Sequence, residues 1–226
     1  SMCVIPNAMP YSDIKNDEFV GFVADYMHLI EEKIKKPIKL IPTQSWAESL
    51  KFAADRKCDI LSLLKETPSR KEYLNFTTPY LNPSVVLVTK PNVYFIDDVQ
   101  VLKTEKIGVV KGYASKDVLL QQYPHMKIIE VENIENGLKK VIQGELFGVI
   151  DALPTIAYRI QGEFIGQLKI SAKVIDIWEM GIGVRNDDLI LLNILNKAIE
   201  KLPKNIESTI LNKYIGIKYE KGFDYT

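Results

Sequence analysis

Residues 59–80, which read D-I-L-S-L-L-K-E-T-P-S-R-K-E-Y-L-N-F-T-T-P-Y, decide the fold of this chain. They open with an apolar run, Ile60–Leu64, which is bounded by charged residues and predicts a buried strand. Thr67 and Pro68 then stand as helix N-cap and first helical residue, a position where proline's missing N–H is not needed. We therefore expect a short helix at the carboxyl end of the strand, with Arg70 on its first turn.

The residues around this helix start are suited to an anion. Arg70 supplies a guanidinium, Lys65 an ammonium, and Thr67 and Ser69 two hydroxyls, while the first turn of the helix has free N–H groups. Such a group attracts a carboxylate or a phosphate. A solvated helix start with an ordinary surface arginine accounts for the same residues, so both interpretations stay open at this point.

Composition limits the classes of protein to consider. The chain has 226 residues, of which 46% are hydrophobic, enough for one domain or two small lobes. Lys+Arg and Asp+Glu both total 29, so charge favours neither nucleic acid nor anionic lipid as a partner. No apolar span is long enough to cross a membrane. No signal peptide is recognisable, so a leader gives no information on localisation.

The two cysteines, Cys3 and Cys58, each stand at the head of a predicted strand. In an oxidising compartment they could pair if those strands are neighbours, but we favour buried free thiols that behave as small apolar residues. The two histidines, His28 and His125, do not have the spacing of a zinc site. We expect no metal and no other cofactor.

Strands and helices alternate along the chain, which predicts an α/β fold. The expected strands are 3–5, 38–42, 60–64, 84–90, 106–110, 127–131, 147–150 and 181–184. The expected helices are 21–35, 45–55, 133–143 and 189–202, with further ones after Ser115, Pro154 and Pro203. We expect Ser115 and Asp187 to cap the helices that follow them.

The pattern T-P-x-R-x-x-x-x-x-F-[TS]-x-P-Y after a strand resembles the core motif of the bacterial extracellular solute-binding proteins of the polar amino-acid type. These two-lobed Venus flytrap domains also serve as sensor domains of histidine kinases. The resemblance covers nearly the whole chain, including F-V-G-F-V-A-D-Y (19–26), S-W-A-E-S-L (45–50), K-C-D-I-L (57–61) and V-V-K-G-Y-A-S (109–115). It implies a type II periplasmic-binding-protein fold. Lobe 1 would comprise residues 1–88 and 184–226 and lobe 2 residues 91–182, joined by two crossing hinge strands.

The resemblance also implies a small-molecule ligand in the cleft between the lobes. Arg70 and Lys65 would hold a carboxylate, helped by the backbone of 112–115, and aromatic side chains would supply the walls. The ligand-binding residues expected on this basis are Trp46, Lys65, Thr67, Arg70, Tyr80, Gly112, Tyr113, Ala114, Ser115 and Asp151.

Two positions depart from the family's pattern. The aromatic residue that often stacks on the ligand, in the loop after the first strand, is replaced by Ala8. The aspartate that takes the ligand's ammonium at the end of the strand 147–150 corresponds to Ala152, and Asp151 stands one residue early. Either the register differs by one residue, or the ligand lacks an α-ammonium held in the usual way. The sequence does not decide between them.

Three functions compete. The tail 219–226 resembles the segment that precedes the membrane helix in flytrap sensor domains, which favours a periplasmic sensor tethered to the inner membrane and coupled to a membrane signalling module. The alternatives are the solute-binding subunit of an amino-acid ABC importer with its permease, and an enzyme similar to cyclohexadienyl dehydratase. We expect binding rather than catalysis, because no nucleophile–base pair, metal set or nucleotide loop is evident.

Overall fold

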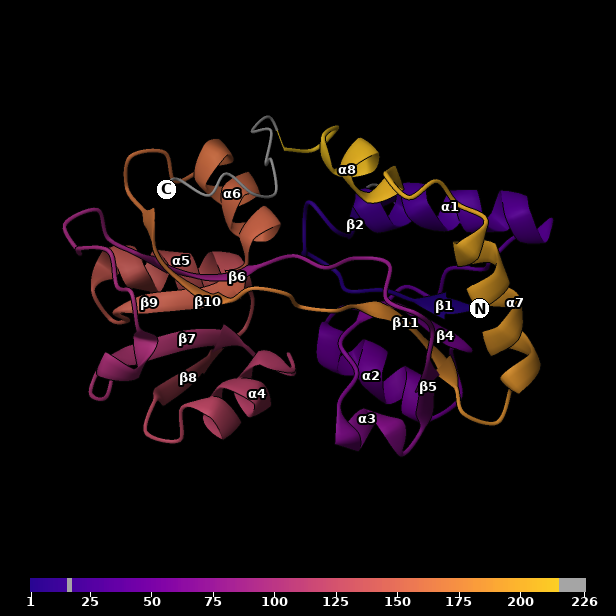
Figure 1. The fold of residues 1–226 in the computed structure, drawn as a ribbon, viewed down its shortest axis with the longest axis horizontal. Coiled ribbons are helices and arrows are strands. Elements are labelled where there is room, and N and C mark those ends of the chain that lie inside the picture. Colours follow the sequence, from indigo (N-terminus) through magenta and orange to yellow (C-terminus); the bar gives the residue numbers. More distant parts are fainter. Residues whose placement is uncertain (16–17, 216–226) are drawn as a thin grey trace.

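Two mixed sheets organise the computed structural model, which describes residues 1–15 and 18–215. Each sheet carries its own helices and forms one lobe, and the lobes lie side by side along the long axis of the molecule (Figure 1). Lobe 1 contains a four-stranded sheet and lobe 2 a five-stranded sheet. A separate two-stranded hairpin, β2 (Asp13–Lys15) and β3 (Glu18–Val20), accompanies lobe 1.

The sheet of lobe 1 is built around β4. Its strands, in sheet order, are β1 (Met2–Cys3), β4 (Ile60–Leu64), β11 (Gly181–Arg185) and β5 (Leu74–Phe76). All five residues of β4 are buried, as its apolar sequence predicts. The helices of this lobe are α1 (Phe22–Ile34), α2 (Trp46–Ala54), α3 (Pro68–Lys71), α7 (Leu189–Glu200) and α8 (Ile206–Leu211).

The sheet of lobe 2 contains a parallel core and two antiparallel strands. In sheet order its strands are β10 (Lys169–Ile175), β6 (Val85–Thr89), β9 (Gly148–Ala152), β7 (Lys106–Val110) and β8 (Lys127–Val131). β7 runs parallel to β8 and β9, whereas β6 runs antiparallel to β9 and β10. The helices are η1 (Val99–Val101), α4 (Ser115–Gln122), α5 (Ile134–Gln143) and α6 (Leu153–Gly162).

Two antiparallel segments, 81–84 and 176–180, cross between the lobes (Figure 1). They are hydrogen-bonded to each other: Trp178 N donates to Pro83 O at 2.9 Å, and the Ser84 hydroxyl donates to Asp176 O at 2.9 Å. A pair of crossing segments permits bending of one lobe against the other. β6 pairs with lobe 2 strands along its whole length. The residue boundaries predicted for the lobes stay a prediction.

Local signals predicted several helix starts correctly. The Ser45 side chain accepts a hydrogen bond from Glu48 N, and Thr67 accepts one from Arg70 N. The caps predicted at Ser115 and Asp187 are wrong. α4 begins at Ser115 itself, after Ala114 as N-cap residue. Asp188 caps α7 through Leu191 N, because the Arg185 guanidinium engages Asp187, with Nε 2.7 Å from Oδ1.

Several predictions on strands and chain ends also need correction or fall outside the structure. The segment 38–42 forms only an isolated bridge between Leu40 and Met2, not a strand. The strands β2, β3, β5 and β10 were not predicted. The tail 219–226 lies outside the described residues. In the part of the chain that the structure describes, no helix is long and apolar enough to span a membrane.

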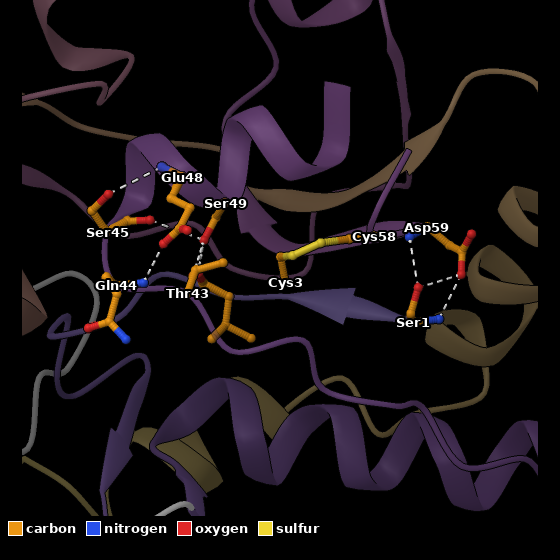
Figure 2. The surroundings of a disulfide bond; sticks show 10 residues. Ser1, Cys3, Thr43, Gln44, Ser45, Glu48, Ser49, Cys58 and Asp59 are labelled. Atoms are coloured by element: carbon orange, nitrogen blue, oxygen red, sulfur yellow. Dashed lines mark hydrogen bonds and ion pairs between the residues drawn. A yellow bond between two sulfur atoms is a disulfide. The ribbon is translucent and has the colours of Figure 1, made fainter. Parts of the chain in front are cut away.

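Cys3 and Cys58 form a disulfide, so the preference for free thiols is wrong (Figure 2). β1 pairs in parallel with β4, with Cys3 opposite Leu61, and this register brings the two cysteines to a Cα–Cα distance of 5.8 Å. The bond ties β1 to the residues that precede β4, across a sequence separation of 55. It therefore anchors the N-terminal strand to the strand that leads into the cleft.

We expect this disulfide to contribute about 2–5 kcal/mol to the free energy of unfolding, because it restricts the unfolded chain. The double variant Cys3→Ser, Cys58→Ser should unfold at a correspondingly lower denaturant concentration than the oxidised protein. Dithiothreitol should destabilise the original chain and leave the double variant unaffected. Equal midpoints for the oxidised chain and the double variant would exclude this contribution.

Candidate functional site

A cavity of about 60 Å³ lies between the two lobes, where the carboxyl ends of β4 and β9 and the turn after β7 meet. Ligands of open α/β sheets bind at such strand ends. Of the residues predicted to bind a ligand, those that line this cavity are Trp46, Lys65, Arg70, Tyr113, Ala114, Ser115 and Asp151. The structure therefore brings together side chains from both lobes that lie far apart in the sequence.

Arg70 links the two lobes. Its side chain is 7% exposed; Nη1 donates to Lys65 O at 2.7 Å, and Nη2 donates to Gly112 O, in lobe 2, at 3.0 Å. Trp46 donates from Nε1 to the same Gly112 oxygen at 3.1 Å. Burial lowers the pKa of the Arg70 guanidinium, which stays charged because arginine titrates far above neutral pH. Gly112 thus takes part in the contact between the lobes through its carbonyl group. Its φ of 79° lies in the left-handed region, which suits glycine.

Lys65 is the second cation at the cavity. It directly follows β4, and its Nζ lies 4.8 Å from the centroid of the Trp178 ring, within the range of a cation–π contact. Trp178 belongs to one of the crossing segments and also lines the cavity. Both cations of the cavity lining therefore come from lobe 1, at the end of β4 and on α3.

Asp151 brings a carboxylate from lobe 2. It lies on β9, opposite Val86 of β6, and is 8% exposed. Its Oδ1 accepts a hydrogen bond from Ala152 N at 2.6 Å, but Oδ2 has no partner within the described structure. Burial raises the pKa of Asp151 from its ordinary 3.8 to about 7, and the bond from Ala152 only partly opposes this. The carboxyl group therefore changes charge near neutral pH.

Two hydroxyls of the same cavity are also unpaired. The Tyr11 hydroxyl and the Ser115 Oγ are buried and make no hydrogen bond in the described structure. Burial raises the pKa of Tyr11 well above its ordinary value, so its phenol stays protonated. A buried polar atom without a partner costs about 1–3 kcal/mol. Three such atoms at one cavity, counting Asp151 Oδ2, indicate a place for a polar molecule.

Sequence reasoning missed some of these residues and placed others differently. Tyr11 lies in the loop after the first strand, and the sequence analysis assigned no role to it. Tyr80 does not line the cavity: its ring stacks on Tyr26, with centroids 4.1 Å apart, and its hydroxyl donates to Ser62 O. Thr67 caps α3 and does not line the cavity. Ala8, at the position where relatives often carry the stacking aromatic, does line it.

Comparison with known proteins identifies relatives over nearly the whole chain. The family model for bacterial extracellular solute-binding proteins, family 3, matches residues 1–217. The virulence sensor protein BvgS of Bordetella pertussis is 22% identical over 210 residues, which cover 92% of this chain and 17% of that protein. The chain thus spans only about a sixth of this sensor relative.

Two further matches extend the comparison. The ABC transporter arginine-binding protein 1 of Escherichia coli K12 is 29% identical over 201 residues, covering 84% of this chain and 79% of that protein. The crystal structure of the periplasmic VFT2 domain of Bordetella pertussis BvgS superposes with a TM-score of 0.86 at 21% identity, covering 94% of this chain and 92% of that one. This likeness confirms the predicted two-lobed α/β fold.

The raised pKa of Asp151 predicts a specific dependence of stability on pH. Between about pH 4 and pH 7 the folded chain holds a proton on Asp151 that the unfolded chain has released, so the free energy of unfolding falls as pH rises. Asp151→Asn removes this dependence. We expect the variant to gain on the order of 2–4 kcal/mol relative to the original chain between pH 4 and pH 8.

Denaturant unfolding at several pH values measures this difference, with Asp97→Asn, a change at an exposed aspartate, as the matched control. The control should follow the original chain at every pH. Parallel pH profiles for Asp151→Asn and the original chain would show that Asp151 is not the buried acid described here.

Proposed function

Because the chain belongs to the bacterial extracellular solute-binding proteins of family 3, we propose that it is the periplasmic sensor domain of a membrane signalling protein. It binds a small amino acid or a related carboxylate between its lobes and closes on it. Membership of this family makes the chain a solute-binding flytrap domain of the amino-acid type. The role as a sensor and the nature of the ligand are the proposal.

The unpaired Oδ2 of Asp151, at a cavity that Lys65 and Arg70 also line, carries the proposal. The two cations come from lobe 1 and the carboxylate from lobe 2, so a zwitterion can bind to both lobes at once. Arg70 gives two N–H groups to backbone carbonyls, which leaves three of its five for a ligand carboxylate. A ligand with contacts in both lobes favours the closed arrangement, since only closure provides all of them.

The three unpaired oxygens favour an ammonium over a simple carboxylate. Asp151 Oδ2, the Tyr11 hydroxyl and Ser115 Oγ can each accept a hydrogen bond, and an ammonium has three donors. Its positive charge would also hold Asp151 in the ionised form, which burial alone disfavours. Of the two alternatives left open by the sequence, we therefore propose that Asp151 binds the α-ammonium in place of the residue at Ala152.

The role as a sensor is supported by the likeness to BvgS, a sensor protein, along 92% of this chain. The disulfide is typical of oxidising compartments, the periplasm among them, and supports the proposed localisation. The arginine-binding relative favours the alternative, an importer subunit that works with a permease. The full-length gene separates these functions: a membrane helix and a signalling module after Thr226 indicate the sensor, and their absence the importer.

A thermal-shift screen tests the ligand class, because a ligand that binds only the folded state raises the melting temperature. Amino acids should stabilise the chain more than their deaminated analogues do.

Arg70→Ala should weaken binding of the best amino acid by about 2–5 kcal/mol, and Arg70→Lys should weaken it too, because lysine lacks the planar fork.

Asp151→Asn separates the two ends of the ligand. It should cost on the order of 1.5–3 kcal/mol of affinity for the amino acid and spare simple carboxylates. Stabilisation by the amino acid that persists unchanged in Asp151→Asn would exclude Asp151 as the ammonium-binding group. Turnover of prephenate or arogenate by the chain would instead favour the dehydratase function.

A further inference from the structure

Arg70 and Lys65, the two cations of the cavity lining, lie against different aromatic rings. The Arg70 Cζ atom is 5.8 Å from the centroid of the Trp46 ring, at the start of α2. The Lys65 Nζ atom is 4.8 Å from the centroid of the Trp178 ring, which belongs to one of the two crossing segments. Both rings line the cavity. The cavity therefore offers an anion two separate cationic positions.

The two cations also differ in their charged partners. Asp117, in the first turn of α4, acts on Arg70 through its negative charge and opposes the lowering of the Arg70 pKa by burial. The Lys65 ammonium makes no hydrogen bond and no ion pair with any residue that the structure describes. Lys65 is partly exposed, and at such a site a ring face attracts a cation by only about 0.5–1 kcal/mol. A ligand carboxylate is a stronger partner for this ammonium.

An ordinary zwitterion leaves the charge of Lys65 unpaired. Arg70 has three N–H groups that bond to no backbone carbonyl, enough for both oxygens of the ligand's α-carboxylate. Asp151, the one acidic residue of the lining in the described part of the chain, pairs with the α-ammonium under the proposed function. A second carboxylate on the ligand would balance the remaining positive charge, that of Lys65.

Resting on the proposed function, we infer that Lys65 binds a second carboxylate of the ligand, so that the cleft selects acidic amino acids such as L-glutamate and L-aspartate. Their amides, L-glutamine and L-asparagine, have nearly the same shape but offer Lys65 only a neutral acceptor, which forms a weaker hydrogen bond. L-arginine would bring a third cation beside Lys65 and Arg70, which is unfavourable. The expected specificity thus differs from that named for the arginine-binding relative.

Titration calorimetry of the 226-residue chain tests this inference by comparing each acid with its own amide. At least one of the two acids should bind at least tenfold more tightly than its amide. Amides that bind as tightly as the acids would overturn the inference and leave the proposed function standing. Absence of binding by both acids would also overturn the inference. The proposed function fails with it only if glycine, L-alanine, L-leucine and L-arginine do not bind either.

Glutarate separates the inference from the proposed function, because it carries two carboxylates and no ammonium. It should bind more weakly than L-glutamate. Glutarate that binds as tightly as L-glutamate, while L-glutamine binds weakly, would support the second carboxylate at Lys65 and contradict Asp151 as the ammonium-binding group.

Lys65→Met provides the second test, because methionine removes the charge and keeps an unbranched side chain. The ratio of the affinities for the acid and its amide should fall to near one. Lys57→Met is the matched control: Lys57 Nζ also lies against an aromatic ring, that of Phe52, at 4.6 Å, but Lys57 does not line the cavity. The control should keep the ratio of the original chain. A ratio unchanged in Lys65→Met would contradict Lys65 as the site of the second carboxylate.

Discussion

Two hydrogen bonds to the carbonyl oxygen of Gly112, one from Trp46 and one from Arg70, hold the cleft of this domain closed. The residues that bind at this point are positioned by local structure in each lobe. Trp46 is the first residue of α2, Arg70 follows the Thr67 cap of α3, and Gly112 lies in the turn after β7. The contact thus brings the ends of α2 and α3 in lobe 1 against the turn after β7 in lobe 2.

The same closure leaves polar groups of the cavity without partners. Ser115 does not cap its helix, and its hydroxyl instead faces the space that Tyr11 and Asp151 also line. Unsatisfied buried groups lower stability, and natural proteins tolerate them chiefly at functional sites. On our proposal a bound zwitterion supplies the missing partners, which couples occupancy of the cleft to stability of the closed state.

The sequence predicted well what depends on local signals. The apolar run Ile60–Leu64 and the Thr67 cap define the strand and helix that carry Lys65 and Arg70, and both signals lie within a few residues. The family resemblance then indicated seven of the residues that line the cavity, among them Trp46, Arg70 and Asp151. The direction of a side chain is a different matter: Tyr80 belongs to the motif, yet it stacks on Tyr26 in the core.

What the sequence did not predict depends on tertiary pairing. The strands β2, β3 and β5 are only three residues long, and β10 is recognised by its pairing with β6 rather than by its own pattern. The disulfide required the register between β1 and β4, which no local signal specifies. The role of Gly112 rests on its carbonyl group, which carries no mark in the sequence.

Proton release on binding tests the central claim, that the Asp151 carboxylate meets the ligand's ammonium, most directly. Calorimetry of the best-binding amino acid at pH 6, in buffers of different ionisation enthalpy, counts the protons exchanged. Because Asp151 is mostly protonated at pH 6 in the empty cavity and must ionise to pair with the ammonium, our account predicts release of close to one proton per ligand. Binding at pH 6 without proton release would contradict it.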